Sequence, residues 1–359
     1  MMHYCLADYL TVITPYLSRE LVSVEALSRI RAIAQKLQPS WGALLECNLG
    51  SDTSQVDFSI DLLGTAIELD EGIQASSVWQ RIQQLYLSCV NPTSIDRETE
   101  SIWLEFELAR EQQEISIPNV FLSLKEECIQ HLSDNPAAFC WWLIEKAIEP
   151  LLGRTIPVQL QQNLQLCLEA LPLGAQVLHV GVMLSYQTSI IRLKVNGISR
   201  LELSEYLTKI GWDSSAEEFD AIALNLYSLV DRIILNVEIS VTAVTRVGLE
   251  CFVDRYLPQS SQWQPLLNYL VTSNLCTPEK SSALLAWSGL CYEQFYPLPW
   301  PRNLKTVSNF LGTRAFSVLV REINHIELIL QPENTWSAKG YLWFSSDWLK
   351  SKKLKNYSN

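Results

Sequence analysis

The sequence predicts an α+β fold, a ten-stranded antiparallel β-barrel made of five helix–helix–strand–strand repeats and surrounded by helices. Hydrophobic periodicity changes repeatedly along the chain between 3.6 residues, typical of amphipathic helices, and 2 residues, typical of strands. The period-2 segments come in neighbouring pairs with a short turn between them, which is typical of hairpins. Because closure removes unpaired sheet edges and ten strands are enough to enclose a lumen, we expect a closed barrel.

Each pair of strands follows one or more helical segments. The predicted helices are 23–37, 76–89, 139–152, 158–171, 201–212, 217–230, 263–271, 278–287 and 306–322. The predicted hairpins pair 43–49 with 55–62, 101–108 with 119–125, 176–184 with 189–195, 232–240 with 245–253, and 325–331 with 338–344. Helix starts carry capping residues, as in Thr277-Pro278-Glu279, where a hydroxyl, a proline and an acid occupy the first turn.

The two faces of each predicted strand differ in polarity. In the strand 55–62, Val56, Phe58 and Ile60 alternate with Asp57 and Ser59. The apolar faces should lie under the helices, which need an apolar partner. The polar faces also carry large rings, and this favours a lumen over the alternative of an open sheet facing water. These rings are Trp103, Phe121, Phe252, Tyr341 and Trp343.

Composition narrows the class of protein. The chain has 359 residues, a formal net charge of -12 and 48% hydrophobic residues, enough for a large core. We expect one barrel domain over 1–345 and a basic tail over 346–359, whose lysines are Lys350, Lys352, Lys353 and Lys355. The acidic balance argues against nucleic acid as a partner. The most apolar stretch, 137–153, contains charged residues and is too short to cross a membrane.

The first residues lack the basic segment of a secretory signal, so we expect a cytoplasmic protein. Nine scattered cysteines form no CxxC pair and have no histidine at ligand spacing, which favours buried, reduced thiols over disulfides or zinc. Motifs typical of nucleotide-binding folds, zinc proteases and serine hydrolases are absent from the sequence. These absences remove the common nucleotide-binding, protease and hydrolase interpretations, and the main prediction assigns no metal ligand.

The repeat architecture and several segments resemble the ABBA, or PT-barrel, aromatic prenyltransferases, including the indole prenyltransferases. The segment ALLECNLGSDTSQVDFSIDL resembles their first hairpin, in which a strand glutamate accepts the proton of the aromatic substrate. The resemblance implies that role for Glu46. Such a residue must act as a general base toward the nucleophile. His179 is a weaker candidate for the base, and we expect His325 to be a hydrogen-bonded wall residue.

The resemblance also implies a diphosphate site and an aromatic shield. The segments SIIRLKVNG, TRVGLECFV and AKGYLWF would supply the diphosphate-binding residues Arg192, Lys194, Arg246, Lys339 and Tyr341. Rings facing the allylic cation would be Trp103, Phe252, Tyr341 and Trp343, and Glu250 would also contact substrate. The match is partial. Asp57 stands where the family usually has an arginine, and Gly248 and Glu250 stand where a lysine and a tyrosine are usual.

These features imply transfer of an allylic prenyl group from a prenyl diphosphate to an aromatic small molecule or a peptide. Acidic residues in the same expected lumen keep alternatives open: Asp57, Asp61, Glu105, Glu107, Glu238, Glu250 and Glu327. One alternative is diphosphate held through Mg²⁺ on Asp57 and Asp61. Another is a barrel of the same fold without a prenyl donor, which binds or modifies a cationic peptide. A third is a purely structural protein.

Overall fold

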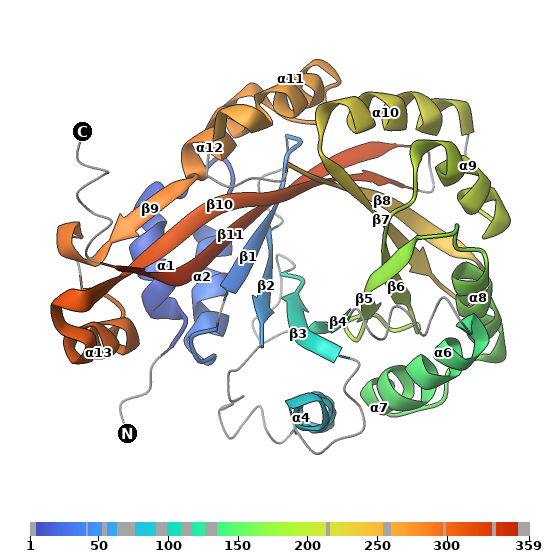
Figure 1. Ribbon diagram of the computed structural model, residues 1–359, viewed down its shortest axis with the longest axis horizontal. Coiled ribbons are helices and arrows are strands. Elements are labelled where there is room, and N and C mark those ends of the chain that lie inside the picture. The colour runs from blue at the N-terminus through green and yellow to red at the C-terminus, as the bar shows by residue number, and fades with distance from the viewer. Residues whose placement is uncertain are drawn as a thin grey trace.

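The structure is a computed structural model that describes residues 5–40, 42–51, 56–62, 76–90, 99–108, 117–125, 135–212, 216–253, 260–296, 299–331 and 335–350. Within these residues, ten antiparallel strands close into a barrel with helices around it (Figure 1). The barrel strands are β1 (Gly42–Asn48), β2 (Val56–Asp61), β3 (Thr99–Phe106), β4 (Asn119–Leu124), β5 (Gln176–Val182), β6 (Ile191–Asn196), β7 (Arg232–Ile239), β8 (Val244–Phe252), β10 (Ala315–Leu330) and β11 (Trp336–Lys350). The predicted fold is confirmed.

Strand β11 closes the barrel. It pairs with β1 on one side, where Glu46 lies opposite Tyr341, and with β10 on the other, where Glu327 lies opposite Lys339. The remaining strands follow the chain order from β1 to β8, and β8 pairs with β10. A further strand, β9 (Gly289–Tyr292), pairs with the first part of β10. Closure leaves no open polar face, so the alternative of an open sheet is wrong.

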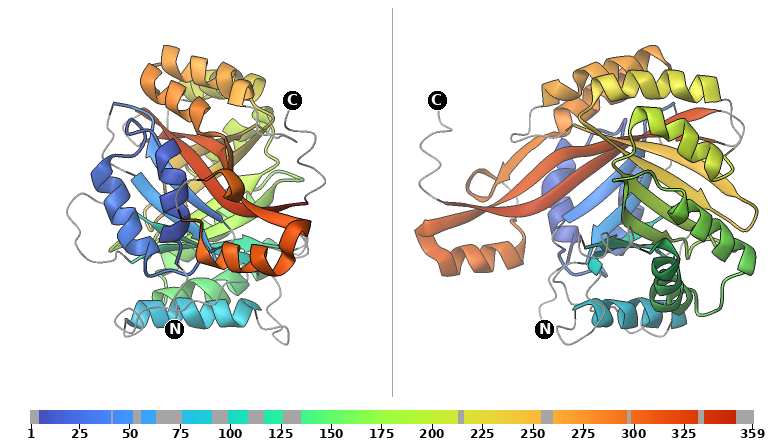
Figure 2. Two further views of the ribbon diagram at one scale, coloured as in Figure 1. Left: turned by 90° about the vertical axis from the view of Figure 1, so that its left-hand side faces the viewer. Right: turned by 45° about the vertical axis from the view of Figure 1, so that its right-hand side comes forward.

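The helices form an outer layer around most of the barrel (Figure 2). They are α1 (Ala7–Ile13), α2 (Val24–Ala34), α4 (Ser77–Val90), α6 (Pro136–Leu143), α7 (Glu149–Leu152), α8 (Val158–Glu169), α9 (Arg200–Lys209), α10 (Ala216–Leu229), α11 (Gln264–Thr272), α12 (Pro278–Trp287) and α13 (Arg302–Leu311). A π-helical turn, η2 (Ile144–Ile148), joins α6 to α7. Short 3₁₀ turns are η1 (Thr14–Tyr16), η3 (Ser260–Trp263), η4 (Glu293–Phe295) and η5 (Gly312–Arg314).

Local capping explains where several helices begin. The Ser23 hydroxyl accepts a hydrogen bond from the Ala26 amide at the start of α2, and the Thr277 hydroxyl accepts one from the Lys280 amide at the start of α12. Thr277-Pro278-Glu279 therefore begins a helix as predicted. Helix α1 lies before residue 23, where no helix was predicted.

The fifth hairpin is longer than predicted. The predicted helix 306–322 ends early, because α13 stops at Leu311 and Gly312 adopts a left-handed φ of 62°. Strand β10 then begins at Ala315, ten residues before the predicted start at His325. Its first part pairs with both β9 and β11, and this pairing overrides the helical periodicity. In Figure 1 these strand ends, β9 and α13 extend to the left of the barrel.

Strand β11 crosses the predicted boundary between the barrel domain and the tail. Strand β11 continues past residue 345 to Lys350, where it pairs with Ala315 of β10. The rest of the predicted tail, 351–359, lies outside the described residues, as do its lysines Lys352, Lys353 and Lys355.

The core lies between the outer barrel face and the helices. Phe58 and Ile60 belong to one large apolar cluster with helix residues such as Ile30 and Leu164. The alternate residues of β2, Asp57 and Ser59, are buried on the opposite face. The strand faces therefore follow the predicted alternation, and the barrel encloses a polar lumen. Among the described helices, none is both long and apolar enough to cross a membrane.

Candidate functional site

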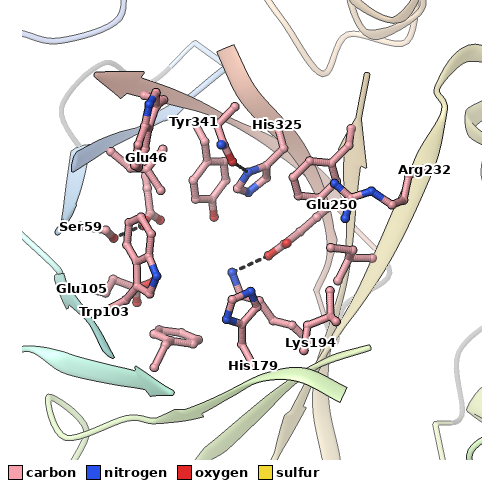
Figure 3. Close-up of a pocket in the computed structure, with 17 residues that line it drawn as sticks. Glu46, Ser59, Trp103, Glu105, His179, Lys194, Arg232, Glu250, His325 and Tyr341 are labelled. Atoms are coloured by element: carbon pink, nitrogen blue, oxygen red, sulfur yellow. Dashed lines mark hydrogen bonds and ion pairs between the residues drawn. The ribbon is translucent and has the colours of Figure 1, made fainter. Parts of the chain in front are cut away.

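A cavity of about 320 Å³ lies inside the barrel, with side chains from strands all around its wall (Figure 3). This volume suits one small molecule or one side chain of a larger ligand. Seven residues predicted for the site line it: Glu46, Trp103, Lys194, Glu250, Phe252, Tyr341 and Trp343. The other lining residues are Leu44, Ser59, Glu105, Phe121, Leu178, His179, Arg232, Ile234, Asn324 and His325.

Aromatic rings cover much of this cavity wall. The Trp103 and Trp343 rings lie 5.8 Å apart between centroids, and Trp343 packs directly over Gly42, where any Cβ would collide with the indole. The His325 ring of β10 stacks on Tyr341 at 3.8 Å and on Phe252 at 4.9 Å. The cavity can therefore hold an apolar or planar group between ring faces.

Glu46 projects from β1 into the cavity and is 3% exposed. The Ser59 hydroxyl donates to its Oε1 at 2.7 Å, and the Lys339 ammonium lies 3.8 Å from its Oε2. Burial, and then the nearby carboxylate of Glu105, raise the pKa of Glu46 to about 8, against the lowering effect of Lys339. At neutral pH Glu46 is therefore mostly protonated. A positive charge placed beside it would favour loss of that proton.

Arg192 is held by several carboxylates. Its Nε donates to Glu238 at 2.9 Å, and its terminal nitrogens lie 3.4 Å from Glu105 and 3.9 Å from Glu107. Burial alone would lower the pKa of Arg192, but Glu105 and Glu238 raise it well above its ordinary value. The guanidinium is therefore charged and its donors are used within the protein.

The Lys194–Glu250 ion pair lies at the cavity wall, with 2.7 Å between Lys194 Nζ and Glu250 Oε1. Burial alone would lower the pKa of Lys194, but the Glu250 carboxylate raises it. The ammonium also lies 5.2 Å from the centre of the Phe121 ring. Lys194 is thus a charged group with its own acidic partner.

Arg246 and Lys339 bind carboxylates too. Arg246 lies 3.8 Å from Glu327, which also accepts a hydrogen bond from the Tyr341 hydroxyl at 2.7 Å. Lys339 donates to Asp57 at 2.9 Å. The Glu327 carboxylate lies where a Cβ at Gly248 would be, so this glycine makes room for it.

Only two of the five residues that were predicted to bind a diphosphate line this cavity. Lys194 and Tyr341 line the cavity, whereas Arg192, Arg246 and Lys339 do not. Each of the four cations lies within 4 Å of a carboxylate. The acidic side chains of the lumen, which the sequence identified, serve as the partners of the basic ones.

Two polar wall residues, Arg232 and Asn324, were not predicted. The Arg232 guanidinium lies 4.2 Å from the centre of the Phe252 ring, its cross-strand neighbour. Extending the alternation to the first residue of β7 would have found it. Asn324 faces the cavity because the pairing register of β10 shifts between Ile323 and His325. The hydrophobic periodicity of the sequence does not reveal such a shift.

The proposed Mg²⁺ ligands have other partners. Asp57 accepts hydrogen bonds from Lys339 and, at 3.3 Å, from the Leu108 amide. Across the described part of the chain, no three His, Cys, Asp or Glu side chains form a group that could hold a metal ion.

Cys47 and Cys251 are buried, and burial raises the pKa of both thiols, so neither is an activated nucleophile.

Comparisons with known proteins support the fold. No protein-family model matches the sequence, and no curated protein matches it significantly. Among solved structures, a 6-dimethylallyl tryptophan synthase is similar with a TM-score of 0.55, 11% identity and coverage of 94% of each chain. The 6-dimethylallyltryptophan synthase from Micromonospora olivasterospora, solved in complex with DMASPP and Trp, has a TM-score of 0.51 and 10% identity, covering 84% of this chain and 81% of that chain. AnaPT from Neosartorya fischeri has 15% identity, coverage of 94% and 85%, and a TM-score of 0.49.

These structural neighbours are ABBA-type aromatic prenyltransferases, and the likeness establishes that this chain has the PT-barrel fold. At such low identity it establishes the fold alone. The chemistry has to be argued from the side chains of the lumen.

Proposed function

We propose that the barrel binds an organic cation, such as an amine or the basic side chain of a peptide, and that it does so without a prenyl diphosphate. One observation carries this proposal: every cation expected to hold the diphosphate already lies beside a buried carboxylate. A diphosphate would have to take these cations from their partners and leave the carboxylates unpaired, which is costly in a buried site. A positively charged ligand would not have to take these cations from their carboxylates.

The cavity supplies both parts of a site for such a ligand. Glu46, Glu105 and Glu250 bring acidic groups to the wall, and Figure 3 shows Glu46 and Glu105 on the side opposite Glu250. The rings of Trp103 and Trp343 provide faces for its apolar part. Aromatic faces also attract cations, so the rings and the carboxylates favour the same charge.

Prenyl transfer is the second candidate. It is favoured by the position of Glu46, the expected base, in a cavity whose walls include Trp103, Phe252, Tyr341 and Trp343. Such rings would shield an allylic cation from water. The paired state of Arg192, Arg246 and Lys339 weighs against it.

Calorimetric titration of the purified full chain separates the two candidates. Tryptamine and tryptophol form a matched pair of probes, because an ammonium in one replaces a hydroxyl in the other. We expect tryptamine to bind at least tenfold more tightly than tryptophol at pH 8, and dimethylallyl and geranyl diphosphates to give no heat with or without Mg²⁺. Micromolar binding of either diphosphate, with no preference for tryptamine, would favour prenyl transfer instead.

A further inference from the structure

A β-bulge turns two consecutive residues of β10 toward the cavity. Ile323 pairs with Leu342 and His325 with Tyr341, so Asn324 is an extra residue without a partner in β11. Neighbours in a regular strand point to opposite faces, yet both Asn324 and His325 line the cavity. The bulge thus places an amide directly beside an imidazole at the ligand site.

The Asn324 amide determines which nitrogen of His325 carries the proton. His325 Nδ1 lies 2.6 Å from the amide oxygen Oδ1, and since an amide oxygen only accepts, Nδ1 is the donor. The other nitrogen, Nε2, is then an acceptor. It is buried and has no hydrogen-bond partner among the residues that the structure describes.

The surroundings keep this ring neutral and fixed. His325 is 4% exposed and lies between the rings of Tyr341 and Phe252. Burial, and then the positive charges of Lys194 and Arg232, lower the pKa of His325 well below its ordinary value. His179, across the cavity, has a different partner: its Nδ1 lies 2.9 Å from the Ser123 hydroxyl and not from an amide oxygen.

We propose that Nε2 of His325 is a ligand-binding acceptor, which receives a hydrogen bond from an N–H or O–H group of the bound molecule. This inference rests on the proposed function for the identity of the site, and it adds a second recognition element to the charge. The ligand class is then a cation with an apolar part and a donor directed at β10. Leaving a buried acceptor unpaired is unfavourable, so a ligand that pairs it should bind about tenfold more tightly than one that cannot.

The test uses a second pair of uncharged probes, indole and 1-methylindole, in which a methyl group replaces the hydrogen of the N–H donor. We expect the wild-type chain to bind indole about tenfold more tightly, and the His325→Phe variant, which retains a stacked ring, to bind both equally. An unchanged preference in this variant overturns the proposal. If His325→Phe does not fold, Asn324→Leu serves, because loss of the Nδ1 partner should leave a mixture of tautomers and reduce the preference.

Nitrogen NMR of the histidine rings gives an independent readout. The chain has only four histidines, so His325→Phe assigns the signals. In the free wild-type chain at pH 8, His325 should carry its proton on Nδ1, and indole, but not 1-methylindole, should shift the Nε2 signal. A proton on Nε2 would overturn the proposal without any ligand. Equal binding of tryptamine and tryptophol, with the indole preference intact, would reject the proposed function alone, and failure of all four probes to bind would reject both.

Discussion

Arg192 and Glu238 face each other across β6 and β7, and their side chains form a 2.9 Å ion pair inside the barrel. Both residues are nearly fully buried. The pair shows how this lumen tolerates its charges: basic groups that could have held an anionic substrate instead neutralise the acids of neighbouring strands.

Replacement of Arg192 by methionine should strongly destabilise the fold. The change leaves Glu105 and Glu238 without their buried partner, and breaking a buried pair from one side costs about 3–5 kcal/mol. Urea unfolding measures this loss. The matched control is Lys209→Met, which removes an exposed ion pair of 2.8 Å with Glu205 and should cost less than about 0.5 kcal/mol. Similar losses in the two variants would contradict the buried network.

Binding of a cation should strengthen as the pH rises toward 8. Glu46 is mostly protonated below its pKa of about 8 and must lose that proton to pair with the ligand. An alkyl ammonium remains charged over this range, so the affinity for tryptamine should rise up to about tenfold per pH unit from 6 and level off above 8. Calorimetry in buffers of different ionisation enthalpy should detect the released proton.

The control for this pH dependence is Glu46→Gln, which keeps an acceptor for the Ser59 hydroxyl and cannot titrate. In this variant the affinity should be weaker at pH 8 and nearly independent of pH. An identical pH profile in the variant would mean that another group is responsible.

Substitutions at the two ends of the Lys194–Glu250 ion pair should change the affinity for tryptamine in opposite directions. Lys194→Met leaves Glu250 without its cation and should increase the affinity for tryptamine at pH 8 by about tenfold, at a cost in stability. Glu250→Gln removes the acid and should weaken binding. Titrations of both variants check this, and changes of the same sign would argue against electrostatic recognition.

Gly42 should be essential for the aromatic wall. The Trp343 indole occupies the space that a side chain at this position would need. Gly42→Ala should therefore displace the ring, break its contact with Trp103, and destabilise the fold by about 1–3 kcal/mol. Affinity for tryptamine should fall in parallel. A variant with unchanged affinity and stability would show that the ring adapts freely.

Local patterns were enough to identify most of the barrel. The alternation in β2 placed Asp57 inward and Phe58 outward, because side-chain direction in a strand depends on position parity alone. The same rule found Trp103 and Tyr341 as lumen residues, whereas Glu46 came from the resemblance to the aromatic prenyltransferases. It failed at β10, where pairing with β9 and β11 converts a segment of helical periodicity into strand.

The tertiary structure decided which carboxylate pairs with which cation inside the barrel lumen. Which acid meets Arg192 depends on strand register and barrel closure, and both are set by contacts between segments far apart in the chain. The bulge that turns Asn324 beside His325 is likewise invisible to periodicity. A sequence pattern lists the charges facing inward, but only their distances show that the cations are already neutralised.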